Sequence, residues 1–222
     1  MLLQVKDVTK IYKRAGLEFK AVDSADFVVD SSEFAIINGQ SGSGKSTLLA
    51  IIAGLLFPES GKVFFEDVDI TQLNDRQLSR LRNEKIGFIP QGHCLLDNFT
   101  VIDNVCLPYY LKKLNGDPYK VAIQLLERIG IAHLANQYPV QLSGGELRRA
   151  AIARGLINSP KLIIADEPTS DLDPINSANI MTLFEEIARS GSAVLVVTHE
   201  FQKPIGCNKH LTMENGRIRN KI

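Results

Sequence analysis

The chain has 222 residues, in which 25 Lys and Arg side chains balance 25 Asp and Glu side chains. This length is sufficient for one domain with a large core, or for a core with a smaller appended lobe. The balanced charge gives no electrostatic reason to expect a nucleic-acid partner. Cys94, Cys106 and Cys207 show no Cys-x-x-Cys spacing, which favours reduced thiols in a cytosolic compartment over a metal site.

The amino-terminal stretch predicts strands. Residues 2–12 and 19–29 are typical of β-strands and predict an antiparallel sheet. The first ten residues, MLLQVKDVTK, bring charged and polar side chains too early for a signal peptide. Apolar runs stay below the ~20 residues that a membrane-spanning helix needs. We therefore expect a chain that does not itself form a path across a membrane.

Residues 34–55, FAIINGQSGSGKSTLLAIIAGL, predict a strand, a glycine-rich turn and a helix. They contain the pattern G-x-x-x-x-G-K-[ST] in the strand-to-helix context that it requires, and glycine lets successive N–H groups converge on phosphate oxygens. We expect Lys45 to reach the β- and γ-phosphates of a nucleotide and the Ser46 hydroxyl to ligate Mg²⁺. A chance match in a chain of this length has a probability on the order of 1%. The predicted nucleotide-binding residues are Gly39, Gln40, Ser41, Gly42, Ser43, Gly44, Lys45, Ser46 and Thr47.

The remaining pattern predicts an α/β fold. Short apolar runs alternate with helical runs, as the strands of a parallel sheet do, at residues 34–37, 85–90, 161–166 and 192–199. Residues from about 100 to 157 are nearly all helical in pattern, and Asp117-Pro118 is a plausible cap and first turn within them. The sequence therefore predicts a helical lobe inserted into the α/β core.

The run LSGGE at residues 142–146 predicts a helix that begins at or just after its two glycines, because Gly145 would cost about 1 kcal/mol in a helix interior. A helix amino terminus can bind an anion through its free N–H groups and its dipole. A serine at this position is more often a simple cap that satisfies one of those N–H groups. Both interpretations remain open from these residues alone.

Two acids follow the apolar run at residues 161–165. Asp166 at the strand tip suits a contact to Mg²⁺, and Glu167 suits a general base or a group that orients water. An Asp-Glu pair after a strand is more often a loop with solvated charges. Its place downstream of a phosphate-binding turn favours the catalytic interpretation.

The order of four motifs, G-x-x-x-x-G-K-S, LSGGE, LIIADEP and VVTHE, resembles the ATP-binding subunit of ABC transporters across nearly the whole chain. The LSGGE run is the specific part, since other P-loop ATPases share the first and third motifs. The resemblance implies one ABC-type ATP-binding domain over residues 1–222. That domain would have a P-loop core with a parallel sheet, an antiparallel β subdomain and an inserted helical subdomain. ATP and Mg²⁺ are the implied cofactors.

Three further positions take roles from this resemblance. Tyr12 matches the aromatic residue that stacks on adenine, although a tyrosine near a strand end is otherwise usually packing. Gln91 matches the glutamine that touches Mg²⁺ and water, and would otherwise be a solvated loop residue. His199 matches the histidine that contacts the γ-phosphate, whereas a lone histidine after a strand is commonly structural. Gln91 and His199 thus join Glu167 as expected catalytic residues, and Gln91 joins Ser46 and Asp166 as an expected metal ligand.

The resemblance also implies a homodimer in which two chains pair head to tail on ATP binding. The LSGGE helix of one chain would close over the γ-phosphate held by Lys45 of the other, through Ser143, Gly144, Gly145 and Glu146. Asp173 matches the aspartate that links the two sites across the dimer. Glu146 stands where glutamine is commoner in the family, and Asp171 where a small residue or asparagine is more usual. These two charges would be felt at the dimer interface.

The stretch LLDNFTVIDNVCLP resembles the lipoprotein-release and macrolide-export group of ABC ATPases. That group implies a membrane-spanning permease subunit with an extracytoplasmic domain, and a cytoplasmic location on the inner face of the cell membrane. A short permease helix would dock in a groove beside Gln91, with Leu95, Leu96 and Phe99 as candidate contacts. The alternative, that these apolar residues fill the core of the helical lobe, is equally open for any one of them.

Other functions of ABC-type ATPases remain as alternatives. The leading prediction is the ATP-hydrolysing subunit of a membrane transporter or of a complex that pulls on an extracytoplasmic partner. A soluble ATPase acting in cell division, DNA repair or translation is the alternative. DNA-repair members carry long coiled-coil insertions, for which residues 46–141 leave no room, and translation factors normally carry two such domains in one chain.

Overall fold

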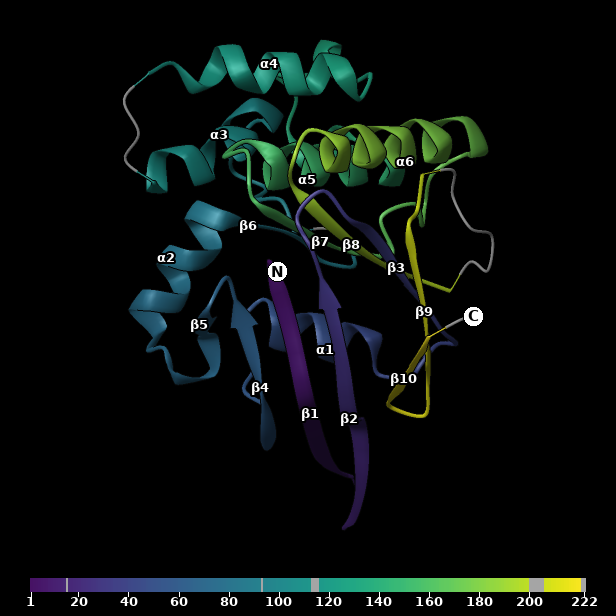
Figure 1. The fold of residues 1–222 in the computed structure, drawn as a ribbon. Helices are drawn as coiled ribbons and strands as arrows, with labels where there is room; N and C mark the ends of the chain where they lie inside the picture. Colours follow the sequence, from purple (N-terminus) through teal and green to yellow (C-terminus); the bar gives the residue numbers. More distant parts are fainter. Residues whose placement is uncertain (15, 93, 113–115, 200–205, 221–222) are drawn as a thin grey trace.

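The computed structural model of the chain describes residues 1–14, 16–92, 94–112, 116–199 and 206–220. These residues form an antiparallel sheet, a mostly parallel sheet and a layer of helices (Figure 1). The antiparallel sheet has the order β2-β1-β4-β5 and consists of β1 Leu3–Arg14, β2 Leu17–Val29, β4 Ser60–Phe65 and β5 Val68–Asp69. The other sheet has the order β10-β9-β3-β8-β7-β6 and consists of β3 Phe34–Asn38, β6 Ile86–Ile89, β7 Leu162–Asp166, β8 Ala193–Thr198, β9 Lys209–Glu214 and β10 Arg217–Asn220. The predicted fold class is confirmed.

Strand direction places the carboxyl ends of the central strands at one edge of the second sheet. β3 pairs in parallel with β8 and β9, β8 with β7, and β7 with β6. Asn38, Thr198, Asp166 and Ile89 are therefore neighbouring strand ends. In parallel α/β sheets, ligand sites lie beyond this edge.

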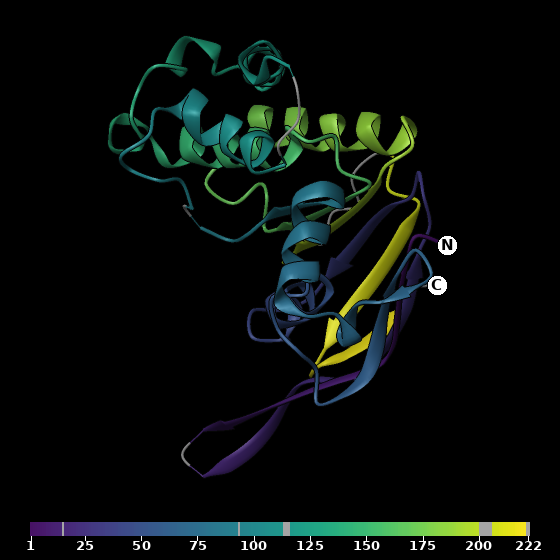
Figure 2. The same ribbon diagram turned by 90° about the vertical axis from the view of Figure 1, so that its left-hand side faces the viewer.

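Helices cover both faces of the parallel sheet. Figure 1 shows α3 to α6 stacked above it and α1 between the two sheets, and Figure 2 shows the β1–β2 hairpin reaching away from the remaining chain. The helix bounds are α1 Lys45–Ile52, α2 Asp75–Lys85, α3 Val101–Leu111, α4 Pro118–Arg128, α5 Gly144–Leu156 and α6 Pro174–Arg189, with 3-10 turns at Ile70–Gln72, Ala132–Leu134 and Pro139–Gln141. The predicted cap at Asp117 is confirmed, since its side chain accepts a hydrogen bond from the Tyr119 N–H at 3.0 Å. Within the described residues, no helix is both long and apolar enough to cross a bilayer.

Alternating side chains of the parallel strands fill a separate hydrophobic core on each face of the sheet. Ile37 and Ile164 belong to the core that packs against α1 and the antiparallel sheet. Ile36 and Ile163, one position away in each strand, belong to the core shared with α3 to α6. The strands β3, β7 and β8 are buried along their whole length, as their continuous apolar runs predict.

The hairpin β9–β10 was not predicted from the sequence, and neither were β4 and β5. β9 adds to β3 in parallel register, with Ala35 opposite Lys209, and so extends the sheet beside the glycine-rich turn that follows β3. The turn uses Asn215 and Gly216 at φ 49° and 81°. An Asn-Gly pair between alternating apolar residues is a signal for such a hairpin. Residues 200–205, in the segment after His199 where the sequence pattern is weak, lie outside the described residues.

Candidate functional site

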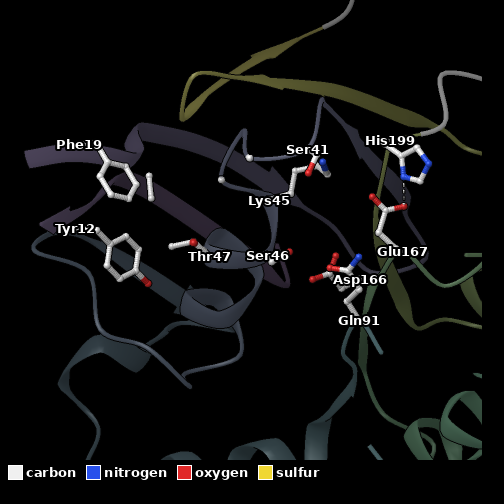
Figure 3. A pocket seen from close by; sticks show the side chains of 13 residues that line it. Tyr12, Phe19, Ser41, Lys45, Ser46, Thr47, Gln91, Asp166, Glu167 and His199 are labelled. Carbon is white, nitrogen blue, oxygen red and sulfur yellow. Dashed lines mark hydrogen bonds and ion pairs between the residues drawn. The ribbon is translucent and has the colours of Figure 1, made fainter. Parts of the chain in front are cut away.

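A cavity of about 550 Å³ lies at the carboxyl edge of the parallel sheet. Figure 3 shows two aromatic rings at one end, an acidic and imidazole pair at the other, and Lys45 and Ser46 between them. All the lining residues except Phe19 and Ala21 belong to the set predicted from sequence. The lining consists of Tyr12, Phe19, Ala21, Ser41, Gly42, Gly44, Lys45, Ser46, Thr47, Gln91, Asp166, Glu167 and His199.

The glycine-rich turn wraps closely around the ammonium group of Lys45. Lys45 is 7% exposed, and its Nζ donates to the carbonyl oxygens of Gly39 at 2.7 Å and Gln40 at 3.0 Å. Gly44 has φ 104°, and a Cβ there would lie 1.9 Å from the Ala21 carbonyl oxygen. α1 begins at the next residue and has no acidic side chain in its first turn. The turn therefore presents N–H groups, a helix amino terminus and a buried cation, which together suit phosphate oxygens.

Asp166 is a buried carboxylate at the end of β7. It is 4% exposed, and its Oδ1 has no hydrogen-bond partner among the described residues. Burial raises the pKa of Asp166, while a hydrogen bond with Ser46 and the positive charge of Lys45 lower it. Carboxylate and hydroxyl oxygens are ligands that Mg²⁺ prefers, usually one or two per ion together with phosphate oxygens. Asp166 and Ser46 thus fit a magnesium ion bound with a nucleotide.

Glu167 occupies a strained position beside Asp166. It is 6% exposed and has φ 49°, a left-handed conformation that glutamate adopts rarely. Its N–H donates to the Val197 carbonyl oxygen at 2.9 Å, and its Oε2 lies 2.9 Å from His199 Nδ1. The imidazole is largely exposed, with 62% of its side-chain surface accessible. This pair holds a carboxylate at the cavity wall, where it can accept a proton from water.

Tyr12 and Phe19 form the aromatic end of the cavity. They face each other across the β1–β2 pair, and their ring centroids are 5.8 Å apart with an interplanar angle of 30°. Tyr12 is 38% exposed and Phe19 is 49% exposed. Exposed rings at the mouth of a polar cavity suit a planar base. The sequence reading found Tyr12 and missed Phe19, whose position follows from the strand register.

Other predicted residues lie outside this cavity. Gly39, Gln40 and Ser43 line an adjoining cavity of about 320 Å³ between the turn and the β9–β10 hairpin. The lining of the larger cavity includes neither the LSGGE residues nor Asp173 among the described residues. Asp173 caps α6 instead, where its Oδ1 accepts hydrogen bonds from the N–H groups of Ile175 and Asn176, both at 3.0 Å.

The LSGGE motif opens α5, as predicted. Ser143 is the cap residue, and its N–H donates to Glu146 Oε2 at 2.7 Å while its hydroxyl accepts from the Glu146 N–H at 3.4 Å. Both hydrogen bonds together form a capping box. Gly145 packs closely on the next loop, since a Cβ there would lie 3.0 Å from the Asp171 carbonyl oxygen. The cap interpretation is therefore right for Ser143, and its exposed position leaves the helix end open to a further contact.

The three candidate docking residues in the segment after Gln91 differ in exposure. Leu96 and Phe99 are each 44% exposed, whereas Leu95 packs against the core of the helical layer. The buried Asn104 side chain holds the segment, accepting from the Leu96 N–H at 2.7 Å and donating to the carbonyl oxygens of Leu96 and Phe99. The core alternative therefore applies to Leu95. Leu96 and Phe99 remain available to a partner.

A hollow of about 260 Å³ lies between α2, β6, α3 and α5. Its apolar lining includes Phe88 and the 66% exposed Leu111. Arg154 also lines it and donates to the Cys94 carbonyl oxygen at 2.6 Å, which ties it to the segment after Gln91.

Arg148 is a further residue at the site that the sequence reading missed. It lies on α5 and is 1% exposed. Its guanidinium donates to backbone carbonyl oxygens at the ends of β6 and β7. The signal was available, because Arg148 shares the inward face of the helix with Ala151 and Ile152, three and four residues on.

Comparisons with known proteins agree with this geometry. The family model described as "ABC transporter" matches residues 22–170. The "Lipoprotein-releasing system ATP-binding protein LolD" of Shewanella frigidimarina (strain NCIMB 400) is 42% identical over 217 residues, 97% of this chain and 91% of that protein.

Solved structures extend the match to three dimensions. A dimeric post-hydrolysis state of the ATP-binding cassette MJ0796, bound to ADP and Pi, matches with a TM-score of 0.95 and 34% identity, covering 99% of this chain and 98% of that chain. A nucleotide-free ATP-binding cassette from an ABC transporter matches with a TM-score of 0.80 and 27% identity, covering 99% and 92%. The family match and the identity over nearly the full length show that this chain belongs to the ABC transporter family, as an ATP-binding subunit with ABC-type ATPase activity.

Proposed function

We propose that the 550 Å³ cavity is the ATP site of this subunit. The observation that supports this proposal most directly is the order of the groups along the cavity. Aromatic rings lie at one end, Lys45 in the middle and the Glu167–His199 pair at the other end (Figure 3). That order matches the base, the phosphates and the site of bond cleavage in ATP. Tyr12, joined by Phe19, would stack on adenine. Lys45 and the N–H groups of residues 39–47 would hold the β- and γ-phosphates.

Mg²⁺ would be held by the Ser46 hydroxyl, by Asp166 and by Gln91. The unpartnered Oδ1 of Asp166 supports this assignment, because a bound cation would compensate a buried charge. When bound, Mg²⁺ would supply positive charge that neutralises the charge developing on the phosphate oxygens. Gln91, at the cavity wall, would contact the ion or the attacking water.

Glu167 would orient or deprotonate the water that attacks the γ-phosphate. Its hydrogen bond with His199 would hold the carboxylate toward the cavity, and His199 would also contact the γ-phosphate. In this assignment the strained backbone conformation of Glu167 directs its side chain so that the carboxylate stays against the end of the strand.

We infer a head-to-tail homodimer in which each ATP lies between two chains. The LSGGE helix end, from Ser143 to Glu146, would cover the γ-phosphate of the partner copy. Its exposed start and its absence from the cavity lining of its own chain support this arrangement, as do the dimeric structures of the similar cassette. Asp173 would lie near the same interface, at the amino end of α6.

The partner across the membrane would be a permease subunit with an extracytoplasmic domain, and the cargo a lipoprotein. The 42% identity to a lipoprotein-releasing ATP-binding protein supports this choice. The subunit would then sit on the cytoplasmic face of the cell membrane. A short permease helix would dock where Leu96 and Phe99 adjoin the hollow lined by Leu111.

The docking test uses charge substitutions at exposed apolar residues. Leu96→Asp and Phe99→Asp would each put an unpaired charge into the docking surface and should weaken co-purification with the permease at least tenfold. Val68→Asp is the matched control, since Val68 is 51% exposed on the antiparallel sheet. ATP binding should stay normal in all three variants. Unchanged co-purification, or equal loss with Val68→Asp, would contradict the docking assignment.

A further inference from the structure

The guanidinium of Arg148 is buried and has no carboxylate hydrogen-bond partner among the residues that the structure describes. Its Nη1 donates to the Pro90 carbonyl oxygen at 2.5 Å, its Nε to the Pro168 carbonyl oxygen at 3.3 Å, and its Nη2 to the Asp166 carbonyl oxygen. Among the described residues it forms no ion pair, and burial lowers its pKa. Burying a charged side chain costs free energy, even where its described hydrogen bonds go to backbone carbonyls and carboxylates such as Asp166 act on it from nearby. Its geometry therefore calls for an explanation beyond packing.

The three carbonyl groups belong to the segments that carry the reacting side chains. Pro90 directly precedes Gln91, and Asp166 and Pro168 flank Glu167. Glu167 has an unfavourable φ of 49°, so its backbone needs support on both sides. Arg148 provides that support in one rigid, planar fork.

The amino end of the same helix carries LSGGE, close to Arg148. α5 runs without interruption from Gly144, so Arg148 lies about 7 Å along the axis from the Ser143 cap. Backbone hydrogen bonds in an α-helix join each residue to the residue four positions earlier, so the first turns of α5 are mechanically connected. A shift at its amino end would therefore shift the fork on Pro90, Asp166 and Pro168.

We propose that Arg148 is a positioning residue that couples the LSGGE end of α5 to the backbone holding Gln91 and Glu167 in the same chain. This inference rests on the proposed dimer, in which that helix end contacts phosphate bound by the partner copy. Closure over the partner's site thereby sets the geometry of the chain's own site. Arg148 in this way links the two ATP sites of the dimer.

The first test is Arg148→Lys, which keeps the charge and loses the planar fork, with Arg148→Gln as a second variant that keeps donors and loses the charge. Both should lower kcat at least tenfold while changing ATP affinity less than threefold. The ATP-dependent dimer should persist when Arg148→Lys is combined with Glu167→Gln. Ile152→Val is the control, because Ile152 is buried on the same helix and contacts no carbonyl of these segments through a polar atom. The Ile152→Val substitution should lower the unfolding temperature and leave kcat unchanged.

The second test asks which site Arg148 controls. In a mixed dimer, Glu167→Gln in one chain keeps ATP bound there and leaves a single hydrolysing site, formed by Lys45 and Glu167 of the other chain. Arg148→Lys in the chain that retains Glu167 should abolish most turnover. The same change in the chain with Glu167→Gln, which supplies only LSGGE to the hydrolysing site, should have at most a threefold effect.

A normal kcat in Arg148→Lys and Arg148→Gln dimers would contradict the coupling role of Arg148 and leave the proposed dimer unaffected. A loss of turnover that appears only when Arg148→Lys is in the LSGGE-supplying chain would also contradict the inference. So would a loss of turnover equal to that of an Ile152→Val dimer with the same thermal stability. Failure of the Glu167→Gln chain to pair with ATP overturns the proposed dimer and this inference together.

Discussion

At the scale of single residues, Asp166 shows a conflict between stability and function. Its carboxylate is buried next to Glu167, and burial raises its pKa from the usual 3.8. The native state therefore binds a proton more tightly than the unfolded state does. By linkage, this group lowers stability progressively as pH rises from 3.8 through its native pKa, and the loss persists at neutral pH.

Asp166→Asn should stabilise the nucleotide-free protein while abolishing turnover. The amide keeps the shape, removes the buried charge and loses a magnesium ligand. Thermal unfolding without nucleotide should show a higher midpoint than wild type at pH 7, and the difference should shrink as the pH falls through the raised native pKa of Asp166. A lower midpoint at pH 7 would contradict this account of the site.

Whether a residue of the site could be predicted from the sequence depends on which interactions determine its position. The places of Lys45, Ser46 and Asp166 at the cavity were predictable, because the phosphate and metal chemistry expected of their motifs dictates both residue type and spacing. Phe19 was missed because its place opposite Tyr12 depends on the register of two strands, which spacing alone does not give. The partners of Arg148 are backbone carbonyls, which leave no trace in the sequence, so its place on the inward face of α5 was the one sign of its burial.

At the scale of elements, the glycine-rich turn between β3 and α1 packs closely against the hairpin β9–β10 and against β2. Gly39 lies against the Met213 carbonyl and Gly44 against the Ala21 carbonyl. Short-range pattern predicted the strand, turn and helix at residues 34–55. It did not predict β9–β10, because this hairpin joins the sheet by pairing with β3, far away in sequence.

Two glycines of this turn provide a matched test. Gly44 and Gly42 both have positive φ, at 104° and 80°, but a Cβ would clash only at Gly44. Gly42→Ala should cost about 1 kcal/mol for its backbone conformation alone. Gly44→Ala should cost at least about 2 kcal/mol more, because the Ala21 strand must move away. Denaturant unfolding without nucleotide measures both, and equal losses would show that β2 does not confine the turn.

At the scale of the whole molecule, the parallel sheet gathers groups from distant segments at one edge, while LSGGE is placed on a separate helix. Lys45, Asp166, Glu167 and His199 line one cavity, whereas Ser143 does not. The sequence order of the motifs predicted both facts through the family resemblance. The geometry makes pairing of two chains the direct way to bring LSGGE and Lys45 to one phosphate.

The central measurement is light scattering of the Glu167→Gln chain with and without ATP. The substitution keeps the shape of the side chain and removes its base, so ATP and Mg²⁺ should bind without turnover. The account predicts a monomer without ATP and a dimer with ATP. Adding Lys45→Ala, or bulky residues at Ser143 and Gly145, should abolish the dimer, and only Lys45→Ala should also abolish nucleotide binding. A monomer under all conditions, or a dimer indifferent to Ser143 and Gly145, would show that LSGGE is only a helix cap.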